Sequence, residues 1–312
     1  MRYLILILTA MSVSACGMLS NVQKSPYRAA QPEVRDVPYS ARPGDELRKK
    51  VMVLPFLDQK VDRSKNVVET ARRVVVNDLL RTRQFVIVNN TDFPQDVKSY
   101  LKDSKSYDMA AIARVAKALG VSAVIEGKVM EIRAKRVGDE IGVFRKVKAS
   151  VDVTIGLRVF GTKTGREILT TTRKATAEAE TTRVAQDSYS DRHLQEDPIL
   201  VARGVSKAFR STVPLVVKAV EKLNWEGRVA MIDGDRIFVN AGRLSGIQVG
   251  DILKVVEEGD EVFDPETGTF LGYAPGRMKG TLEVTSYFGK DGSVSVIHSG
   301  SGFKENDRVE LY

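Results

Sequence analysis

Residues 147–166 read VKASVDVTIGLRVFGTKTGR, and this stretch decides the fold class of the first part of the chain. Apolar side chains occupy every second position from Val147 to Val159, and mostly polar side chains lie between them. Because successive side chains of a strand point to opposite faces, this alternation predicts a strand with one buried face. Gly161–Gly165 then predicts a turn, and Arg166–Ala179 predicts an antiparallel return strand.

The residues before this strand predict alternating strands and helices. The spacing of apolar side chains predicts an amphipathic helix over Val67–Arg81. A second helix is expected after Asp108, which is suited to the N-cap, and should end at Gly120. Three short apolar runs predict buried strands, at Val51–Phe56, Phe85–Val88 and Val121–Val129.

Two prolines mark helices after the return strand. Asp197 followed by Pro198 gives an N-cap with Pro at the first helical position, and predicts a helix that runs to about Thr212. Pro214 either kinks this helix or begins another one that ends near Leu223. Together these elements predict an α/β module, in which helices pack against a mixed sheet.

The composition of the chain changes after this module. The 312 residues exceed a typical single domain of about 100–200 residues. Residues 224–312 hold 15 acidic and 9 basic residues and 14 of the 24 Gly, whereas residues 1–223 carry a net charge of +14. We therefore predict a boundary near Leu223–Glu226, with an α/β domain over residues 45–223 and a second domain over residues 224–312.

The second module predicts strands only. Its Asp233-Gly234 pair is typical of a β-hairpin turn. Ser245–Asp251 and Ser301–Asp307 resemble each other, and each predicts a turn ahead of a strand. Further strands are predicted at Asp251–Glu257, Lys279–Phe288, Ser293–Ile297 and Arg308–Leu311. The predicted fold class is therefore α/β (α+β): a mixed sheet with packed helices, followed by a small all-β barrel-like domain or sandwich.

Residues 1–16 read MRYLILILTAMSVSAC and have the pattern of an exported lipoprotein. A basic start is followed by an apolar run, Tyr3–Met11, which is too short to span a bilayer as an ordinary helix and predicts a secretory signal. Val13–Cys16 matches a bacterial lipobox, in which small residues precede the cleavage point and the thiol carries diacylglycerol. We therefore predict lipidation at Cys16, the only Cys of the chain.

The residues after Cys16 predict an outer-membrane location. Gly17 stands where an Asp would be the usual inner-membrane retention signal in enteric-type bacteria. We therefore expect the chain to be anchored in the outer membrane and to face the periplasm. Residues 17–44 are polar and contain four prolines, which predicts an extended, disordered tether.

The residue types and motifs favour no catalytic or metal site. One Cys and two His, His193 and His298, provide no thiolate cluster and no zinc set, and neither a Walker loop nor a G-x-G-x-x-G is present. S-x-x-K occurs at Ser99–Lys102 and Ser301–Lys304, and K-T-G occurs at Lys163–Gly165, but no S-D-N lies between them. We predict no catalytic residue, no metal, no cofactor and no enzyme activity.

The basic balance of residues 1–223 is a feature that nucleic-acid-binding proteins share. An exported location argues against that partner, and we predict no nucleic acid. We expect instead a solvated face, or attraction to anionic lipid headgroups, a glycan-peptide polymer or an acidic protein surface. The acidic second module of another copy is one such surface, and this pairing favours head-to-tail rings.

Three segments of the first module, at Val51–Phe56, Leu119–Gly127 and Val151–Arg166, resemble the core of the CsgG family. The resemblance covers about residues 45–223, and the lipobox and the closing helices fit it. A related nucleus occurs in the TolB amino-terminal domain and in lipoprotein activators of penicillin-binding proteins. CsgG is an outer-membrane lipoprotein that assembles rings for curli subunit export, so the resemblance implies a ring-forming lipoprotein.

The second module resembles the carboxy-terminal domain of FlgT. The residues that carry this likeness are Gly227–Val229, Val239–Gly242, Gly246–Asp251 and Asp264–Gly268. FlgT is a periplasmic component of a flagellar ring, and its middle domain is similar to the TolB nucleus. This likeness implies a role in the flagellar motor or basal body.

Two insertions, Arg133–Lys148 and Arg173–Gln195, match the hairpins that supply the pore strands of CsgG. A membrane-barrel strand needs about 9–11 residues with one apolar face. Charged side chains interrupt both faces of the first insertion, and the best face of the second consists of Ala between Arg173 and Arg183. Because a mid-bilayer Arg or Lys costs about 2–4 kcal/mol, we predict no transmembrane barrel.

The sequence thus predicts a non-enzymatic outer-membrane lipoprotein. We expect a homo-oligomeric ring that is anchored through Cys16 and contacts envelope protein partners, flagellar ring or secretion components among them. Two alternatives remain open. One is a curli-type secretion or assembly channel component, and the other is a lipoprotein activator of a cell-wall synthase.

Overall fold

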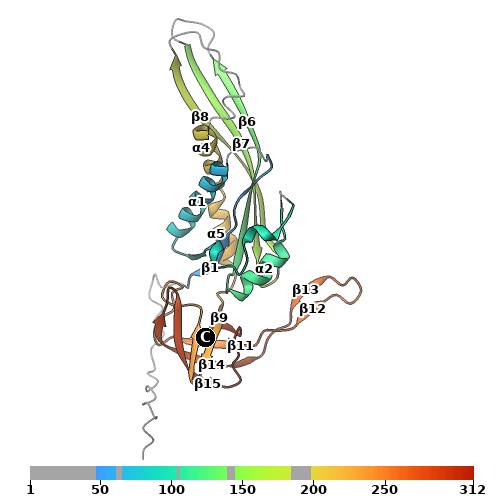
Figure 1. The fold of residues 1–312 in the computed structure, drawn as a ribbon, viewed down its shortest axis with the longest axis vertical. Coiled ribbons are helices and arrows are strands. Elements are labelled where there is room, and N and C mark those ends of the chain that lie inside the picture. The colour runs from blue at the N-terminus through green and yellow to red at the C-terminus, as the bar shows by residue number, and fades with distance from the viewer. Residues whose placement is uncertain (1–46, 61–64, 104–105, 139–144, 184–197) are drawn as a thin grey trace, which may run out of the picture. The chain divides into compact units, whose positions relative to one another are not determined.

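The computed structural model describes residues 47–60, 65–103, 106–138, 145–183 and 198–312. The predicted signal, Cys16, the tether, Asp197 and His193 lie outside these residues. The described residues belong to one compact unit, residues 41–312. This unit contains a mixed sheet with packed helices and a closed β-barrel (Figure 1), so the predicted fold class is confirmed.

A six-stranded sheet forms the first part of the fold, with the strand order β3-β1-β6-β7-β8 and β2 beside β6. Its strands are β1 (Lys49–Val53), β2 (Leu57–Asp58), β3 (Phe85–Val88), β6 (Ala123–Gly138), β7 (Arg145–Gly161) and β8 (Glu167–Arg183). β1 is parallel to β3 and β6, whereas β7 is antiparallel to both β6 and β8. The alternating stretch after Val147 lies in β7, and the return strand is β8, as predicted.

Helices cover both faces of this sheet. The helices are α1 (Lys65–Arg81), α2 (Met109–Ala118), α4 (Pro198–Arg210) and α5 (Val213–Glu221). Val51 of β1 packs in one core with α1, α4 and α5, and its neighbour Met52 packs in a second core with α2. Because successive strand residues face opposite ways, the two cores lie on opposite faces of the sheet. Pro214 lies in the first turn of α5, so it begins a second helix and does not kink α4.

The structure corrects the predicted end of the third strand at Val129. β6 continues to Gly138, after a register shift at Met130. Beyond this point Ile132 and Ala134 pack against the core on the helix side, while Glu131, Arg133 and Lys135 are exposed. Charged residues at the exposed positions leave this part of the sequence without an apolar run, so the longer strand was not predicted. Pairing with β7 holds these residues in a strand.

Short elements connect β3 to α2 in the sheet module. Two turns of 3-10 helix, η1 (Asn90–Asp92) and η2 (Val97–Tyr100), precede the two-stranded pair β4 (Leu101–Asp103) and β5 (Ser106–Tyr107). Asp108 then caps α2, because its carboxylate accepts a hydrogen bond from the N–H of Ala111 at 3.1 Å. The predicted N-cap is therefore confirmed.

The second part of the fold is a closed barrel with the strand order β10-β15-β14-β11-β16-β9. Its strands are β9 (Gly227–Asp233), β10 (Arg236–Val239), β11 (Ile252–Val256), β14 (Met278–Phe288), β15 (Gly292–Gly300) and β16 (Arg308–Leu311). The predicted hairpin joins β9 to β10 through Gly234, whose φ is +61°. Trp225 packs in the barrel core. A further pair, β12 (Glu261–Phe263) and β13 (Phe270–Tyr273), escaped the sequence prediction.

The predicted repeat forms two equivalent turns ahead of the neighbouring strands β11 and β16. Gly250 and Asn306 have φ of +94° and +69°. The Asp that follows each of them accepts a hydrogen bond from a backbone N–H three residues earlier, at 2.7 Å in both turns. The repeat thus encodes a turn, as the sequence indicates.

Candidate functional site

The one site residue that the sequence nominates, Cys16, lies outside the described residues. Its lipidation therefore stays a prediction. The candidate sites within the described residues are a pocket beside the barrel and the free edges of the sheet.

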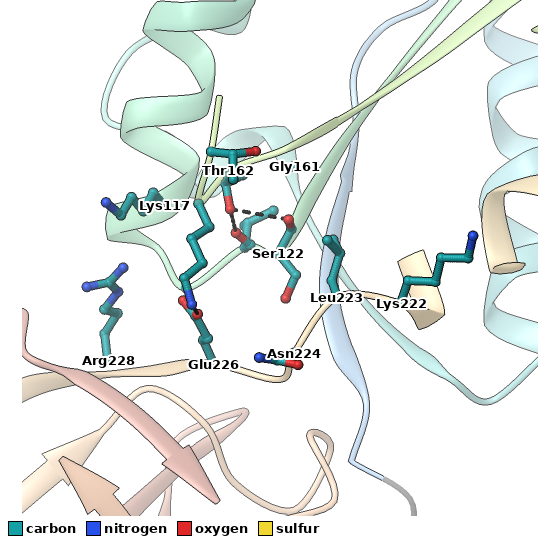
Figure 2. Close-up of a pocket in the computed structure, with 13 residues that line it drawn as sticks. Lys117, Ser122, Gly161, Thr162, Lys222, Leu223, Asn224, Glu226 and Arg228 are labelled. Carbon is teal, nitrogen blue, oxygen red and sulfur yellow. Dashed lines mark hydrogen bonds and ion pairs between the residues drawn. The ribbon is translucent and has the colours of Figure 1, made fainter. Parts of the chain in front are cut away.

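A pocket of about 210 Å³ opens where loops of the sheet meet the start of β9 (Figure 2). The polar and charged side chains around it include Lys117, Ser122, Thr162, Lys163, Glu226 and Arg228. Thr162 closes one wall, because its hydroxyl donates to the carbonyl oxygens of Val121 and Ser122 (Figure 2). Lys222 lies on the side of the pocket opposite to Lys117 and Arg228 (Figure 2).

Glu258 pairs with two cations at this pocket. Its carboxylate accepts from Lys117 Nζ at 2.9 Å and from the guanidinium of Arg228. Burial by itself would raise the pKa of Glu258, but the hydrogen bonds from Lys117 and Arg228 outweigh burial and hold that pKa below its usual value. Lys117 Nζ also lies 3.0 Å from the centre of the Tyr273 ring, a cation–π contact. The side chain of Lys117, on α2, is thus fixed by two groups from the barrel module.

The K-T-G segment of the sequence lies at the same pocket. Lys163 Nζ is 2.7 Å from Glu226 Oε1, which also faces Arg308 Nε at 3.9 Å. The hydroxyl oxygen of Ser122 is buried and has no hydrogen-bond partner among the described residues. A serine nucleophile needs a base within hydrogen-bond reach, and among the described residues none lies within that reach of Ser122.

Asn240 joins the barrel to the end of α2. Its side-chain Nδ2 donates to the carbonyl of Leu119 at 3.2 Å, and its Oδ1 accepts from the N–H of Arg228 at 2.8 Å. Gly120 lies against this amide with φ of +72°, and a Cβ there would fall 2.9 Å from Nδ2. Gly120 therefore ends the helix, as predicted, and also makes room for Asn240.

Two other residues that could take part in chemistry, His298 and Asp264, have hydrogen-bond partners close to them in the fold. His298 Nδ1 lies 2.9 Å from the hydroxyl of Thr281, and Asp264 accepts from the N–H groups of Glu266 and Thr267 in a turn between β12 and β13. Within the described ranges, no three His, Cys, Asp or Glu side chains form a group that fits a metal ion. No helix among the described residues is long and apolar enough to cross a membrane.

The sheet has two long free edges, which the sequence did not reveal. β1 and β2 pair with β6 only as far as Val129, and beyond it the described part of β6 pairs with β7 alone. β8 pairs with β7 over its whole length and with no other described strand. Residues 131–135 alternate charged and apolar side chains, and this alternation is the signal that could have predicted the longer β6. It was not used because these residues contain no apolar run.

The Ala face of the second insertion is covered by protein. Ala177 is buried, and Ala175 and Ala179 pack against the core that contains α4. Gly204 of α4 permits this approach, since a Cβ there would lie 2.9 Å from Val153 Cγ2 and 3.5 Å from Ala177 Cβ. The small side chains of β8 thus serve helix packing.

Comparisons with known proteins find no family model and no curated protein that matches the sequence. The solved structures that this chain is similar to include hypothetical protein CT253 from Chlamydia trachomatis, with 13% identity and a TM-score of 0.35, covering 55% of this chain and 98% of that one. Lipoprotein GNA1162 from Neisseria meningitidis has 11% identity and a TM-score of 0.28, with the same coverages of 55% and 98%. The LpoB C-terminal domain from Salmonella enterica has 12% identity and a TM-score of 0.25, covering 42% and 84%.

One of these three similar structures, that from Neisseria meningitidis, is named as a lipoprotein. Similarity at this level carries no argument for a family or a function. The resemblances to CsgG and FlgT therefore rest on the sequence segments alone.

Proposed function

We propose that this chain is a non-enzymatic outer-membrane lipoprotein that associates with copies of itself into a ring in the periplasm. In this proposal the lipid on Cys16 anchors the chain, the sheet module joins neighbouring copies, and the barrel module meets envelope partners. The ring would act as an assembly or stabilising component of a cell-envelope machine of the CsgG type. The FlgT-like segments favour the flagellar motor or basal body as that machine.

The observation that carries this proposal is the pair of free strand edges. An unpaired edge presents a row of N–H and C=O groups that another strand can pair with. Residues 130–138 of β6 offer one such edge, and β8 offers the other, on opposite sides of β7. Lys207 of α4 satisfies one carbonyl of the β8 edge, that of Thr176, at 3.0 Å.

The directions of these strands fit a head-to-tail contact. β6 and β8 are both antiparallel to β7, so they run in the same direction. A rotation about an axis along the strands would therefore set β8 of one copy parallel to β6 of the next. Such a heterologous contact gives a closed ring when the rotation closes.

The test is a proline at one position of the β8 edge. Because the carbonyl of Thr176 faces Lys207, the N–H and C=O groups of Thr176 point away from β7. The same side is shared by every second residue, so Lys174 also directs its N–H outward. Lys174→Pro removes this N–H and leaves the β7–β8 ladder intact, whereas Lys174→Ala retains it.

We expect the full-length lipoprotein and Lys174→Ala to elute from size exclusion in detergent as an oligomer, with the mass measured by light scattering. Lys174→Pro should be a monomer with an unchanged circular dichroism spectrum. A wild-type chain that stays monomeric at all concentrations, or a proline variant that still forms the oligomer, would contradict the proposal.

The particular machine is tested by crosslinking in the native cell and pull-down through a carboxy-terminal tag. Recovery of flagellar outer-ring, rod-ring or stator proteins would support the motor assignment. Recovery of secreted fibre subunits or of a wall synthase would replace it with export or with wall activation.

A further inference from the structure

A β-hairpin projects from the barrel between β11 and β14, and we call residues 259–276 the arm (Figure 1). Gly259 and Gly276 form its base, where the two chain segments lie very close together. A Cβ at Gly259 would fall 1.7 Å from the carbonyl oxygen of Ala274, and one at Gly276 would fall 1.7 Å from that of Glu257. The two glycines thus allow the arm to leave the barrel as a narrow pair of strands.

The arm is acidic and carries exposed apolar side chains. It contains four acidic residues and no Lys or Arg. Val262, Phe263 and Leu271 are 40%, 48% and 46% exposed. A two-stranded hairpin by itself is marginally stable in water, so these side chains favour a further contact.

The sheet module holds one side of the arm. Lys117 lies over the ring of Tyr273, and Arg166 donates to the carbonyl oxygen of Leu271 at 3.1 Å. These contacts orient the arm and reduce the entropy that it would lose on docking.

A second pocket of the barrel, of about 290 Å³, lies around the β14–β15 turn. The side chains of Arg243, Leu244, Phe288 and Lys290 line it, and we call it the turn pocket. Asp291 shapes it, because its carboxylate accepts from the N–H groups of Gly242 and Ser245, each at 3.0 Å, and from the hydroxyl of Ser245.

The turn pocket complements the arm in charge and polarity. No carboxylate pairs with Arg243 or Lys290 within the described ranges, although residues 224–312 carry six more acidic than basic residues. Leu244 and Phe288 are 39% and 40% exposed. The pocket therefore offers Lys290 beside apolar surface, together with Arg243, whose guanidinium lies 4.8 Å from the centre of the Tyr287 ring. The arm offers carboxylates beside apolar side chains.

We infer that the arm of one copy docks into the turn pocket of a second copy. The arm joins β14 at Met278, whereas the pocket lies at the opposite end of this 11-residue strand, which spans at most about 35 Å. Lys117 and Arg166 hold the arm against the sheet module, so the arm meets the pocket of another copy and not that of its own chain. The contact is thus heterologous, and it rests on the self-association proposed above.

The test uses two Cys substitutions in the full-length lipoprotein, Val262→Cys on the arm and Leu244→Cys at the turn pocket. Both side chains are partly exposed. A short bismaleimide should join the copies of the double variant into a ladder. The matched control combines Val262→Cys with Leu80→Cys, which is 46% exposed on α1 and should give no ladder. The wild-type chain controls for reaction at Cys16.

Charge reversal then tests the complementarity. We expect Lys290→Glu to lower the cross-link yield of the double variant at least about fivefold, and the added change Glu266→Lys to restore it. Lys304→Glu, at an exposed position of another barrel turn, should leave the yield unchanged.

The docking inference and the proposed ring would be contradicted by different results. An oligomer that forms normally but gives no ladder with the arm and pocket pair overturns the docking inference and leaves the ring in place. The docking inference also fails if the arm is captured by another protein instead of a second copy. A wild-type chain that never oligomerises overturns the proposed ring itself.

Discussion

The sheet and the barrel of this chain differ in whether their outermost strands are paired. The barrel closes on itself, because β9 pairs with β10 on one side and with β16 on the other. The sheet ends at β8, and β6 extends well beyond the strands that pair with its outer side. Closure removes unpaired backbone groups, whereas an open sheet retains them.

Because of this difference, the two modules would contact a partner through different groups. The sheet can extend its ladder through backbone hydrogen bonds, which depend little on side-chain identity. Each of the six described barrel strands pairs on both sides, so a contact made by the barrel would involve side chains on its turns. The arm and the turn pocket are such surfaces.

Two spectroscopic signals separate the modules experimentally. Trp225 is the only Trp of the chain, and it is 8% exposed in the barrel core. The α-helices of the described residues all end by Glu221. Tryptophan fluorescence therefore reports on the barrel, and circular dichroism at the helical minimum reports on the sheet module.

The largest effect is expected at Phe209, which fixes the helix layer to the sheet. Its ring stacks on Phe56 with centroids 4.4 Å apart and is fully buried. Gly127 of β6 leaves room for this pair, because a Cβ there would lie 2.7 Å from Phe56 and 2.8 Å from Phe209. Phe209→Ala should lower the free energy of unfolding by about 3–5 kcal/mol in urea titrations followed by circular dichroism.

The matched control is Leu80→Ala, which truncates a 46% exposed side chain on α1 of the same layer. It should change the free energy of unfolding by about 0.5 kcal/mol or less. Equal shifts of the dichroism and fluorescence transitions for Phe209→Ala would show that the junction contacts of Lys117 and Asn240 couple the modules. A shift in fluorescence alone would contradict the assignment of Phe209 to the sheet core.

Local patterns in the sequence predicted much of this fold. The alternation of β7, the Asp108 cap and the Asp233-Gly234 turn each depend on neighbouring residues, and each appears as predicted. The far half of β6 was missed because its apolar positions, such as Ile132, are only partly buried and alternate with charged side chains. β12 and β13 were missed because short strands with exposed apolar side chains carry no burial pattern.

The contacts at the pocket could not be predicted from the sequence, for a related reason. Lys117 and Glu258 come from opposite modules, and they lie 141 positions apart in the sequence. No spacing rule selects that pair among the charges of the chain. The free edges are likewise a property of the strand order, which the sequence left open.

A smaller effect of opposite sign is expected inside the barrel. Ser295 is fully buried on β15, and its hydroxyl oxygen has no hydrogen-bond partner among the described residues. A buried hydroxyl without a partner costs about 1–3 kcal/mol of desolvation, which Ser295→Ala removes. We expect this change to raise the free energy of unfolding by about 1 kcal/mol in fluorescence-monitored urea titrations. Ser245→Ala is the contrasting control and should destabilise, because its hydroxyl donates to Asp291.

The smallest effect concerns the polar face of the open sheet and depends on pH. Asp152 of β7 accepts from Thr176 of β8 at 2.7 Å and lies 2.8 Å from Lys135 Nζ of β6, so it links three strands. Hydrogen bonds from Lys135 and then Thr176 hold the pKa of Asp152 below its usual value. A lowered folded-state pKa stabilises above the unfolded pKa of about 3.9, and the stabilisation is lost as pH falls through the folded-state pKa.

Asp152→Asn retains an acceptor for Thr176 and removes the charge that faces Lys135. Because Asp152 is partly exposed, solvent screens this pair, and the loss at pH 7 should be about 0.5 kcal/mol by circular dichroism. The difference between variant and wild type should shrink as the wild-type carboxylate is protonated at low pH. The matched control is Asp233→Asn, at an exposed barrel carboxylate that pairs with Arg236 on the same hairpin, which should leave the dichroism transition unchanged. A loss that is the same at all pH values would show that the charge of Asp152 does not hold the open sheet together, and the contrast with the closed barrel would then rest on backbone pairing alone.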